Sequence, residues 1–559
     1  MTDATSSQTP GGAAPNDGRD ASGQMIAADG RPLKKSLARA LRAQKLRALA
    51  LIAPLLLFVL ITFIAPIADM LFRSVENQIV SDTMPRATEA LQDWDANAGE
   101  LPPEEVFEAA YYDLFIAAEN KAHTRLGSRL NYEESGMSSM FRRAGRGLDD
   151  IGEVYQDQFK DLNGDWDEAR PWAELMGDAT WISQLESWDG ESTAPRVALR
   201  DDIEALLPRT AEAYQIFAEF VQTVDEDNPL EEEPWTMVHT ALYQDLLDVD
   251  VSGYSGPRAD MLKAADALVA DPTFETITFK DGFEEIDEDW LLLENWRVIK
   301  AYSPDYTIGY FATAADLEKT PDGISLRDED ERIYAKLFQR TLFMSLVITA
   351  SCILLGYPIA YLLSNLPMRT ANLLMILVLL PFWTSLLVRT SAWKVMLQNQ
   401  GVINDTLVWL GMVADDGRLQ MINNQFGTIV AMTHILLPFM ILPMYSVMST
   451  IPPSYVRAAK SLGATNWTTF WRVYFPQSVP GIGAGSILVF ILSIGYYITP
   501  EIVGGTSGIF ISNRIAYHIS SSLNWGLAAA LGSILLVVVL ALYWAYDRIV
   551  GIDNVKLGG

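Results

Sequence analysis

Three ionisable residues lie in or beside long apolar runs of this sequence: Arg389, His434 and Glu501. A charged or titratable side chain at membrane depth is costly, so it normally faces a polar cavity or a partner group. No nucleophile and base or metal-binding cluster accompanies them with recognisable spacing. These residues therefore predict contact with a polar solute. Interfacial anchoring of Arg389 and Glu501, and a helix-to-helix hydrogen bond of His434, are the competing interpretations.

Residue patterns of common catalytic and cofactor sites are absent. There is no G-x-x-x-x-G-K-[ST] stretch, so we expect that the chain does not hydrolyse nucleotide itself. The glycines at 481, 483 and 485 follow no strand, and close helix packing through Gly481 and Gly485 is the expected role. The four histidines are scattered, and the single cysteine, Cys352, lies inside an apolar run. We expect no catalytic residue, metal or cofactor in this chain.

The elements that must position these residues are membrane spans. A bilayer core about 30 Å thick needs about 20 apolar residues per helix. Runs of that length predict six transmembrane helices. They fall near 49–72, 341–363, 371–392, 427–450, 482–503 and 526–546.

Basic residues set the expected orientation. Those before the first run predict that the amino terminus is cytoplasmic, and six spans then place the carboxyl terminus there too. We expect a basic and disordered cytoplasmic tail over 1–48 and a second cytoplasmic tail over 548–559. A cleaved signal peptide is the alternative for the first run, but its length is nearer that of a span. The basic residues are Arg31, Lys34, Lys35, Arg39, Arg42, Lys45 and Arg47.

The acidity of the chain is confined to one segment. The formal net charge is -29, yet residues 76–333 alone hold 59 acidic and 20 basic residues. We expect this segment to be an exported, periplasmic and mainly helical insert domain. Apolar spacing predicts helices in 211–224, 240–249 and 259–270 and a strand in 273–279. The charge is either a solvated surface or a field that gathers cations or docks a partner.

The loop between the fourth and fifth runs, residues 452–481, has a distinct pattern. It reads Pro-Pro-Ser-Tyr-Val-Arg-Ala-Ala-Lys-Ser-Leu-Gly-Ala from Pro452, and Phe475-Pro476 follows. Alanines, then a glycine six positions after Arg457, predict a short helix, a turn and a second short helix. The glycine should close the first helix with a positive φ. Trp467, Phe470 and Trp471 should then place bulky side chains on one surface.

This loop resembles the coupling motif of permease subunits of type I ABC importers. Arg457-Ala458-Ala459 stands where that family has Glu-Ala-Ala, and Gly463 stands where it has glycine. The resemblance implies an all-α polytopic membrane protein, with five helices of the permease domain in 337–547. The coupling residues that it implies are Arg457, Ala458, Ala459, Leu462, Gly463, Ala464, Phe475 and Pro476.

Other segments resemble the first permease subunit of the spermidine/putrescine group, namely 380–393, 401–404, 437–443 and 498–505. This resemblance implies a bacterial inner-membrane subunit that forms a heterodimer with a second permease. It also implies two cytoplasmic ATPase subunits that bind ATP-Mg, and a periplasmic solute-binding protein. Membrane lipid is an expected partner and nucleic acid is not. The resemblance does not extend over 76–333.

A polyamine would need carboxylates or aromatic faces along its path, because cation-π contact is favourable where water is excluded. Helix packing is the alternative role for each candidate. Importers of ferric iron, thiamine or another small solute are alternative functions, and a receptor with an acidic sensing domain is a distant one. In order, the substrate-path candidates are Trp383, Tyr445, Tyr496, Tyr497 and Glu501.

Overall fold

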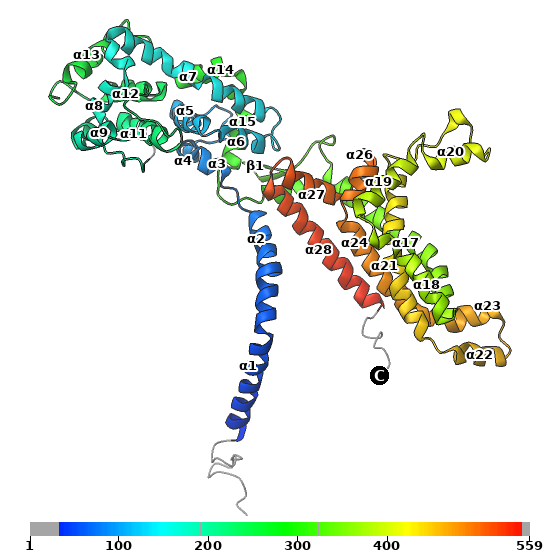
Figure 1. The fold of residues 1–559 in the computed structure, drawn as a ribbon. Coiled ribbons are helices and arrows are strands. Elements are labelled where there is room, and N and C mark those ends of the chain that lie inside the picture. The colour runs from blue at the N-terminus through cyan, green and yellow to red at the C-terminus, as the bar shows by residue number, and fades with distance from the viewer. Residues whose placement is uncertain (1–32, 191, 322, 551–559) are drawn as a thin grey trace, which may run out of the picture. The chain divides into compact units, whose positions relative to one another are not determined.

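The computed structural model describes residues 33–190, 192–321 and 323–550, and it is mostly helical (Figure 1). Its chain contacts separate residues 1–72 from residues 73–559. Helix α1 (Leu33–Val59) continues through a π-helical turn (Leu60–Ile64) into α2 (Ala65–Arg73), whose last residue is the first of the second unit. The basic stretch is therefore helical from Leu33 onward, whereas residues 1–32 and 551–559 of the predicted tails lie outside the described residues. The predicted domain boundaries remain predictions.

Within the described residues, five helices are long and apolar enough to cross a membrane, and a bent helix pair makes up to six. The count of six is thus confirmed if the pair forms one span. The third predicted span is broken, because Met368–Trp383 and Leu386–Trp409 meet at 92°. The fifth, predicted over 482–503, is displaced. The five single helices are Gln44–Arg73, Tyr334–Asn365, Gln425–Thr450, Asn466–Gly495 and Trp525–Arg548.

Three of these helices form the centre of the permease region: α17 (Tyr334–Asn365), α21 (Gln425–Thr450) and α24 (Phe475–Gly495). Glycines let their backbones approach closely. A Cβ on Gly485 would lie 2.7 Å from the sulfur of Met440, and one on Gly481 would lie 3.0 Å from Cα of Met444. The expected helix packing through both glycines is confirmed, as small residues at membrane helix contacts predict.

The other elements of this region are shorter. They are α18 (Met368–Leu379), a 3-10 turn (Leu380–Trp383), α19 (Leu386–Leu397), α20 (Val402–Trp409), a 3-10 turn (Asp415–Gly417), α22 (Pro453–Ser461), α23 (Asn466–Thr469), a π-helical turn (Phe470–Tyr474), α25 (Ile498–Val503), α26 (Gly505–Gly508), α27 (Ile511–Ser520) and α28 (Trp525–Val550).

The insert is a mainly helical domain around an aromatic core, as expected. The long helix α7 presents apolar residues at spacings of three and four, from Met137 to Phe159, and buries them. Five tryptophans are almost fully buried: Trp166, Trp172, Trp181, Trp290 and Trp296. Such a core stabilises the domain without a disulfide, because the single cysteine, Cys352, lies outside it.

The elements of the insert are α3 (Ile79–Thr83), α4 (Pro85–Asp93), α5 (Glu104–Glu119), α6 (His123–Leu130), α7 (Met137–Leu162), a 3-10 turn (Gly164–Asp167), α8 (Ala169–Met176), α9 (Ala179–Glu186), α10 (Asp201–Leu206), α11 (Pro208–Thr223), α12 (Thr236–Asp248), α13 (Ala259–Val269), α14 (Phe279–Ile286), a 3-10 turn (Glu288–Leu291), α15 (Leu293–Ala301), α16 (Gly309–Ala314), β1 (Leu317–Thr320) and β2 (Gly323–Leu326).

The helices predicted from apolar spacing are confirmed as α11, α12 and α13, but the strand predicted over 273–279 is wrong. The segment has no partner strand among the described residues. Instead, the Gln158 side chain bonds both the amide and the carbonyl of Glu275, at 2.8 and 2.9 Å. A side chain thus satisfies the backbone hydrogen-bonding groups that a partner strand would have bonded in a sheet. The described strands, β1 and β2, form an antiparallel hairpin in which Leu317 pairs with Leu326 and Thr320 with Gly323.

The insert packs against the ends of the membrane helices through an apolar cluster of Tyr310, Tyr334, Leu337, Ile511, Leu527 and Leu531. A Cβ on Gly526 would lie 2.4 Å from the ring of Tyr310, so α28 can approach the insert only with glycine at this position. The insert and α28 are therefore in close van der Waals contact at this position.

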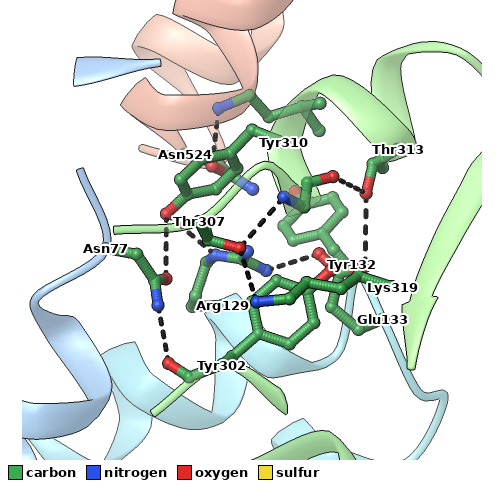
Figure 2. A network of polar contacts seen from close by, with 12 residues as sticks. Asn77, Arg129, Tyr132, Glu133, Tyr302, Thr307, Tyr310, Thr313, Lys319 and Asn524 are labelled. Atoms are coloured by element: carbon green, nitrogen blue, oxygen red, sulfur yellow. Dashed lines mark hydrogen bonds and ion pairs between the residues drawn. The ribbon is translucent and has the colours of Figure 1, made fainter. Parts of the chain in front are cut away.

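Beside this cluster lies a buried polar network (Figure 2). Arg129 donates to Glu133 at 2.7 Å, and Arg327 donates to the other carboxylate oxygen at 2.8 Å. The Arg129 guanidinium lies between the rings of Tyr302 and Tyr310, 4.8 and 4.4 Å from their centroids. Charged side chains buried this deeply need oppositely charged and hydrogen-bonding partners, because removal from water is costly.

Asp316 connects the insert directly to the first helix that follows it. Its carboxylate accepts hydrogen bonds from the amides of Ile333, Tyr334 and Ala335, at 3.0, 2.9 and 2.7 Å. These amides belong to the N-terminus of α17, which has no intrahelical partners for them. The insert thus supplies the capping group of a membrane-length helix.

His518 of α27 is buried at this interface. Its Nε2 lies 3.1 Å from the hydroxyl of Tyr334 and its Nδ1 lies 2.9 Å from the hydroxyl of Ser522. Burial, with a smaller contribution from Arg514, lowers the pKa of His518 to about 4. The neutral imidazole is the form that the fold accommodates.

Acidification should therefore destabilise the protein. Between the ordinary pKa of 6.5 and the folded value of about 4, the unfolded chain binds a proton that the folded chain excludes. Stability should be retained above about pH 6.5 and fall as the pH drops toward 4. We expect the melting temperature to fall from pH 7 to pH 5, and His518→Gln to flatten part of that slope. The buried His239, whose pKa burial also lowers to about 4, should supply another part. Identical slopes in the wild type and the variant would contradict this prediction.

Candidate functional site

The segment between α21 and α24 folds as the sequence predicts at its first helix. Helix α22 runs from Pro453 to Ser461, and Gly463 has a φ of +88°. The amides of Leu462 and Ala464 bond the carbonyls of Ala458 and Ala459, each at 3.1 Å. This is a helix end closed by a left-handed residue, a conformation that favours glycine.

The second half of this segment differs from the prediction. Helix α23 begins at Asn466, after Thr465 accepts a hydrogen bond from the amide of Thr468. It does not end as a separate short helix, because it continues through the π-helical turn into α24. Residues Asn466–Gly495 form one helix of 30 residues, about 45 Å long at the usual rise.

Large apolar side chains are exposed on this segment. Leu462 is 89% exposed and Trp467 is 73% exposed, and the Trp467 and Trp471 rings lie 5.6 Å apart. Phe470 instead packs against Tyr357 and Tyr361. The prediction that all three aromatics share one surface is therefore wrong for Phe470, where the π-helical turn begins and changes the angular spacing of side chains. An exposed apolar patch of this kind is typical of a protein-docking surface.

The remaining residues of the predicted coupling set lie around this patch. Arg457, Ala458 and Pro476 are exposed, while Ala459, Ala464 and Phe475 are half-buried. The structure thus places a backbone turn, small side chains and an exposed aromatic pair together at one end of the long helix.

A polar cluster lies where α19, α21 and α25 meet. The hydroxyls of Thr390 and Thr499 are 3.1 Å apart, and both residues are buried. Trp393 donates from Nε1 to Nδ1 of His434 at 3.1 Å. Arg389 lies within electrostatic range of His434, and its Nε has no hydrogen-bond partner in the described structure. His434 therefore does make a helix-to-helix hydrogen bond, which was one of its two predicted roles.

Three of the five substrate-path candidates lie together near this cluster. Tyr496 and Tyr497 follow the end of α24, and Glu501 lies one turn further on in α25. Trp383 is 72% exposed at the bend between α18 and α19. Tyr445 is separate, because it lies eleven residues after His434 on α21, about 16 Å along the helix axis.

The break after Gly495 is stabilised by side chains of α27. Ser512 donates to the carbonyls of Ile494 and Tyr496, at 3.1 and 2.9 Å. Asn513 donates to the carbonyl of Tyr497 at 2.9 Å and to the carboxylate of Glu501 at 2.6 Å. Carbonyls freed by the end of α24 are thus satisfied within the protein, as membrane depth requires.

Several members of this site were not predicted from the sequence, namely Thr390, Trp393, Thr499, Ser512 and Asn513. The signal available for Thr390 and Trp393 was their position four and seven residues after Leu386, on the side of α19 that faces α21 and α25. Ser512 and Asn513 gave no comparable signal, because their partners are backbone carbonyls of a distant segment.

Known proteins match the permease region of this chain. Residues 343–550 match the family model described as binding-protein-dependent transport system inner membrane component. The spermidine/putrescine transport system permease protein PotB of Salmonella typhimurium (strain SL1344) is 34% identical over 220 residues, which are 39% of this chain and 76% of that protein. The protein of the same name from Escherichia coli (strain K12) is 33% identical over 220 residues, 39% of this chain and 79% of that protein.

A further relative is the inner membrane ABC transporter permease protein YdcU of Escherichia coli (strain K12). It is 32% identical over 222 residues, 38% of this chain and 70% of that protein. Among solved structures, a chain of a bacterial alginate ABC transporter in complex with alginate pentasaccharide-bound periplasmic protein gives a TM-score of 0.35 at 19% identity. That likeness covers 49% of this chain and 99% of the other.

The contrast between Trp467 and Phe470 is testable in the isolated subunit. Trp467→Ala should change the stability of the detergent-solubilised protein by no more than about 0.5 kcal/mol, because the side chain contacts little. Phe470→Ala should destabilise it by about 2 kcal/mol, because the ring packs against Tyr357 and Tyr361 of α17. Thermal unfolding of both variants checks this. Equal destabilisation would show that Trp467 is a packing residue.

Proposed function

The chain belongs to the family of binding-protein-dependent transport system inner membrane components and is a non-catalytic permease subunit of an ABC importer; we propose that its solute is a polyamine of the spermidine and putrescine class. The observation that carries this proposal is the 33–34% identity to two spermidine/putrescine permeases over three quarters of their length. We further propose that residues 452–481 couple transport to a separate ATPase.

Charges around the polar cluster support a cation path that avoids Arg389. Arg389 lies within electrostatic range of Tyr496, so a polycation is repelled there. Tyr497 and Glu501 are exposed, and the Glu501 carboxylate accepts a hydrogen bond from Asn513 but forms no ion pair within the described residues. The proposed path therefore runs past Trp383, Tyr497 and Glu501, where aromatic faces and a carboxylate attract a cation.

The long helix supports a direct mechanical route for coupling. An ATPase that binds Leu462, Trp467 and Trp471 contacts one end of the helix Asn466–Gly495. The other end leads into Tyr496 and the break held by Ser512. Movement of the ATPase can therefore tilt a single element that ends in the polar cluster. We propose that this opens the path alternately toward each side of the membrane.

The proposed assembly has two permease subunits, two ATPase subunits that hold ATP-Mg, and a periplasmic solute-binding protein. In this arrangement both termini and the 452–481 segment are cytoplasmic and the insert is periplasmic. The basic residues before the first membrane helix support that orientation. Arg457, in place of the family's glutamate, is exposed and is proposed to meet the ATPase.

The turn at Gly463 gives a sharp test of coupling. A Cβ there would contact no other atom within 4 Å, so only the positive φ opposes substitution. Gly463→Val should abolish uptake, because a β-branched residue strongly disfavours this conformation. Gly463→Asn should retain most uptake, because asparagine tolerates it. Normal uptake by the valine variant, with both variants present in the membrane at equal amounts, would refute the coupling role.

The solute is tested by uptake of labelled spermidine and putrescine at low external concentration. Deletion of the gene should remove the saturable component, and the wild-type gene should restore it. Unlabelled polyamine should compete, whereas thiamine and ferric iron should not. Saturable polyamine uptake that survives deletion would refute the polyamine proposal and direct the search to other small solutes.

A further inference from the structure

A polar cavity of about 660 Å³ lies between the insert and the start of α28. It is separate from the polar cluster and from the 452–481 segment. Its charged lining consists of Arg73, Arg125 and Arg129 together with Glu76 and Asp82. The volume is within the range of about 300–1,000 Å³ that is usual for small-molecule sites.

Two buried side chains that line this cavity have hydrogen-bond donors without partners. Arg129 and Asn524 are each 6% exposed, and Arg129 Nη2 and Asn524 Nδ2 have no hydrogen bond in the described structure. Their other atoms are fixed. Arg129 donates to Tyr310 and Glu133, and Asn524 Oδ1 accepts from the amide of Leu527. Buried donors without acceptors are costly, and a ligand that supplies oxygen atoms would satisfy them.

The electrostatics of the cavity favour an anion at this end. Asn524 is the residue before α28, so the positive end of the dipole of a 26-residue helix lies at the cavity. The three arginines exceed the two carboxylates by one charge. Figure 2 shows Asn524 beside Tyr310 and the same ring over Arg129, which places both unpartnered donors near one ring.

The position of the cavity along the chain indicates the source of the anion. Arg73 is the last residue of the first membrane-length helix, and Trp525 is the first residue of the last one. Tryptophan at the end of a membrane helix lies at the level of the lipid headgroups, and the long side chain of an arginine near such an end extends toward them. We propose that this cavity binds the headgroup of an aminophospholipid, with its phosphate at Arg125, Arg129 and Asn524 and its ammonium group at Glu76 and Asp82.

Such a lipid would contact both the insert and the permease helices. Its phosphate would bridge α6, which carries Arg125 and Arg129, to the N-terminus of α28. The carboxylates at 76 and 82 select a headgroup with an amine over an anionic one. A free polyamine is a poorer fit, because three arginines line the same space.

Asn524→Asp is a sharp variant for testing this site. Aspartate caps a helix as well as asparagine does, so the bond to the Leu527 amide is retained and the fold should persist. The donor is replaced by a carboxylate oxygen that repels phosphate. Asn424→Asp is the matched control, because Asn424 caps α21 in the same way through the amide of Gly427 and does not line the cavity. Arg125→Gln removes one charge from the exposed rim.

The measurement is native mass spectrometry of the full chain purified in mild detergent and offered phosphatidylethanolamine, phosphatidylcholine or phosphatidylglycerol. The wild type and Asn424→Asp should retain one phosphatidylethanolamine. Asn524→Asp should retain it at least about tenfold less well, as loss of a charged hydrogen bond predicts. Arg125→Gln should also weaken retention. Equal retention by the wild type and Asn524→Asp would overturn the proposal.

Two other outcomes would also overturn it. Equal retention of phosphatidylcholine or phosphatidylglycerol would overturn the assignment of the ammonium group to the carboxylates. Equal stabilisation of the lipid-free protein by inorganic phosphate alone, measured as a shift in melting temperature, would point to a soluble phosphate instead of a lipid. The assay does not involve uptake, so its result is independent of the solute proposed above.

Discussion

Every backbone amide and carbonyl at membrane depth must find a partner within the protein, and the rest of this structure depends on that requirement. Long helices meet it internally over most of their length. Where a helix ends inside the permease region, another element must supply the missing partners. Ser512 and Asn513 do so for the carbonyls of Ile494, Tyr496 and Tyr497. Polar side chains therefore gather near Glu501 because the carbonyls at the end of α24 need hydrogen-bond donors there.

The same requirement explains how the acidic insert is joined to the membrane helices. The N-terminus of α17 presents amides without intrahelical partners, and Asp316 accepts from three residues in succession. Nearby, Glu133 holds two arginines in a buried network. The insert is thus connected to the permease by specific polar contacts as well as by the apolar packing around Tyr310. A movement of α17 or α28 would therefore displace the residues of the insert that contact these helices.

Sequence features that depend on local composition were predictable. The number of apolar runs, the glycine turn at Gly463 and the packing of Gly485 could all be read from residue type and spacing. The end of the fifth span could not be placed, because residues 482–503 are mostly apolar and the partners that stabilise the break lie in α27. Pro500 and Glu501 were the local signals that the helix had already ended. The strand predicted over 273–279 failed for the same kind of reason, since Gln158, far away in the chain, takes the place of a partner strand.

The two ends of the insert are held together by backbone hydrogen bonds. The amide of Asn77 donates to the carbonyl of Asp305 at 2.7 Å, and the amide of Thr307 donates to the carbonyl of Val75 at 2.8 Å. Chain entry and exit therefore coincide, although the residues between them form a whole domain. The entropy of closing a loop depends on where its ends are fixed, and here they are fixed by two neighbouring bonds. The insert is therefore topologically equivalent to a tight turn, so a domain of this size can be accommodated in a permease without any change in the order of its spans along the chain.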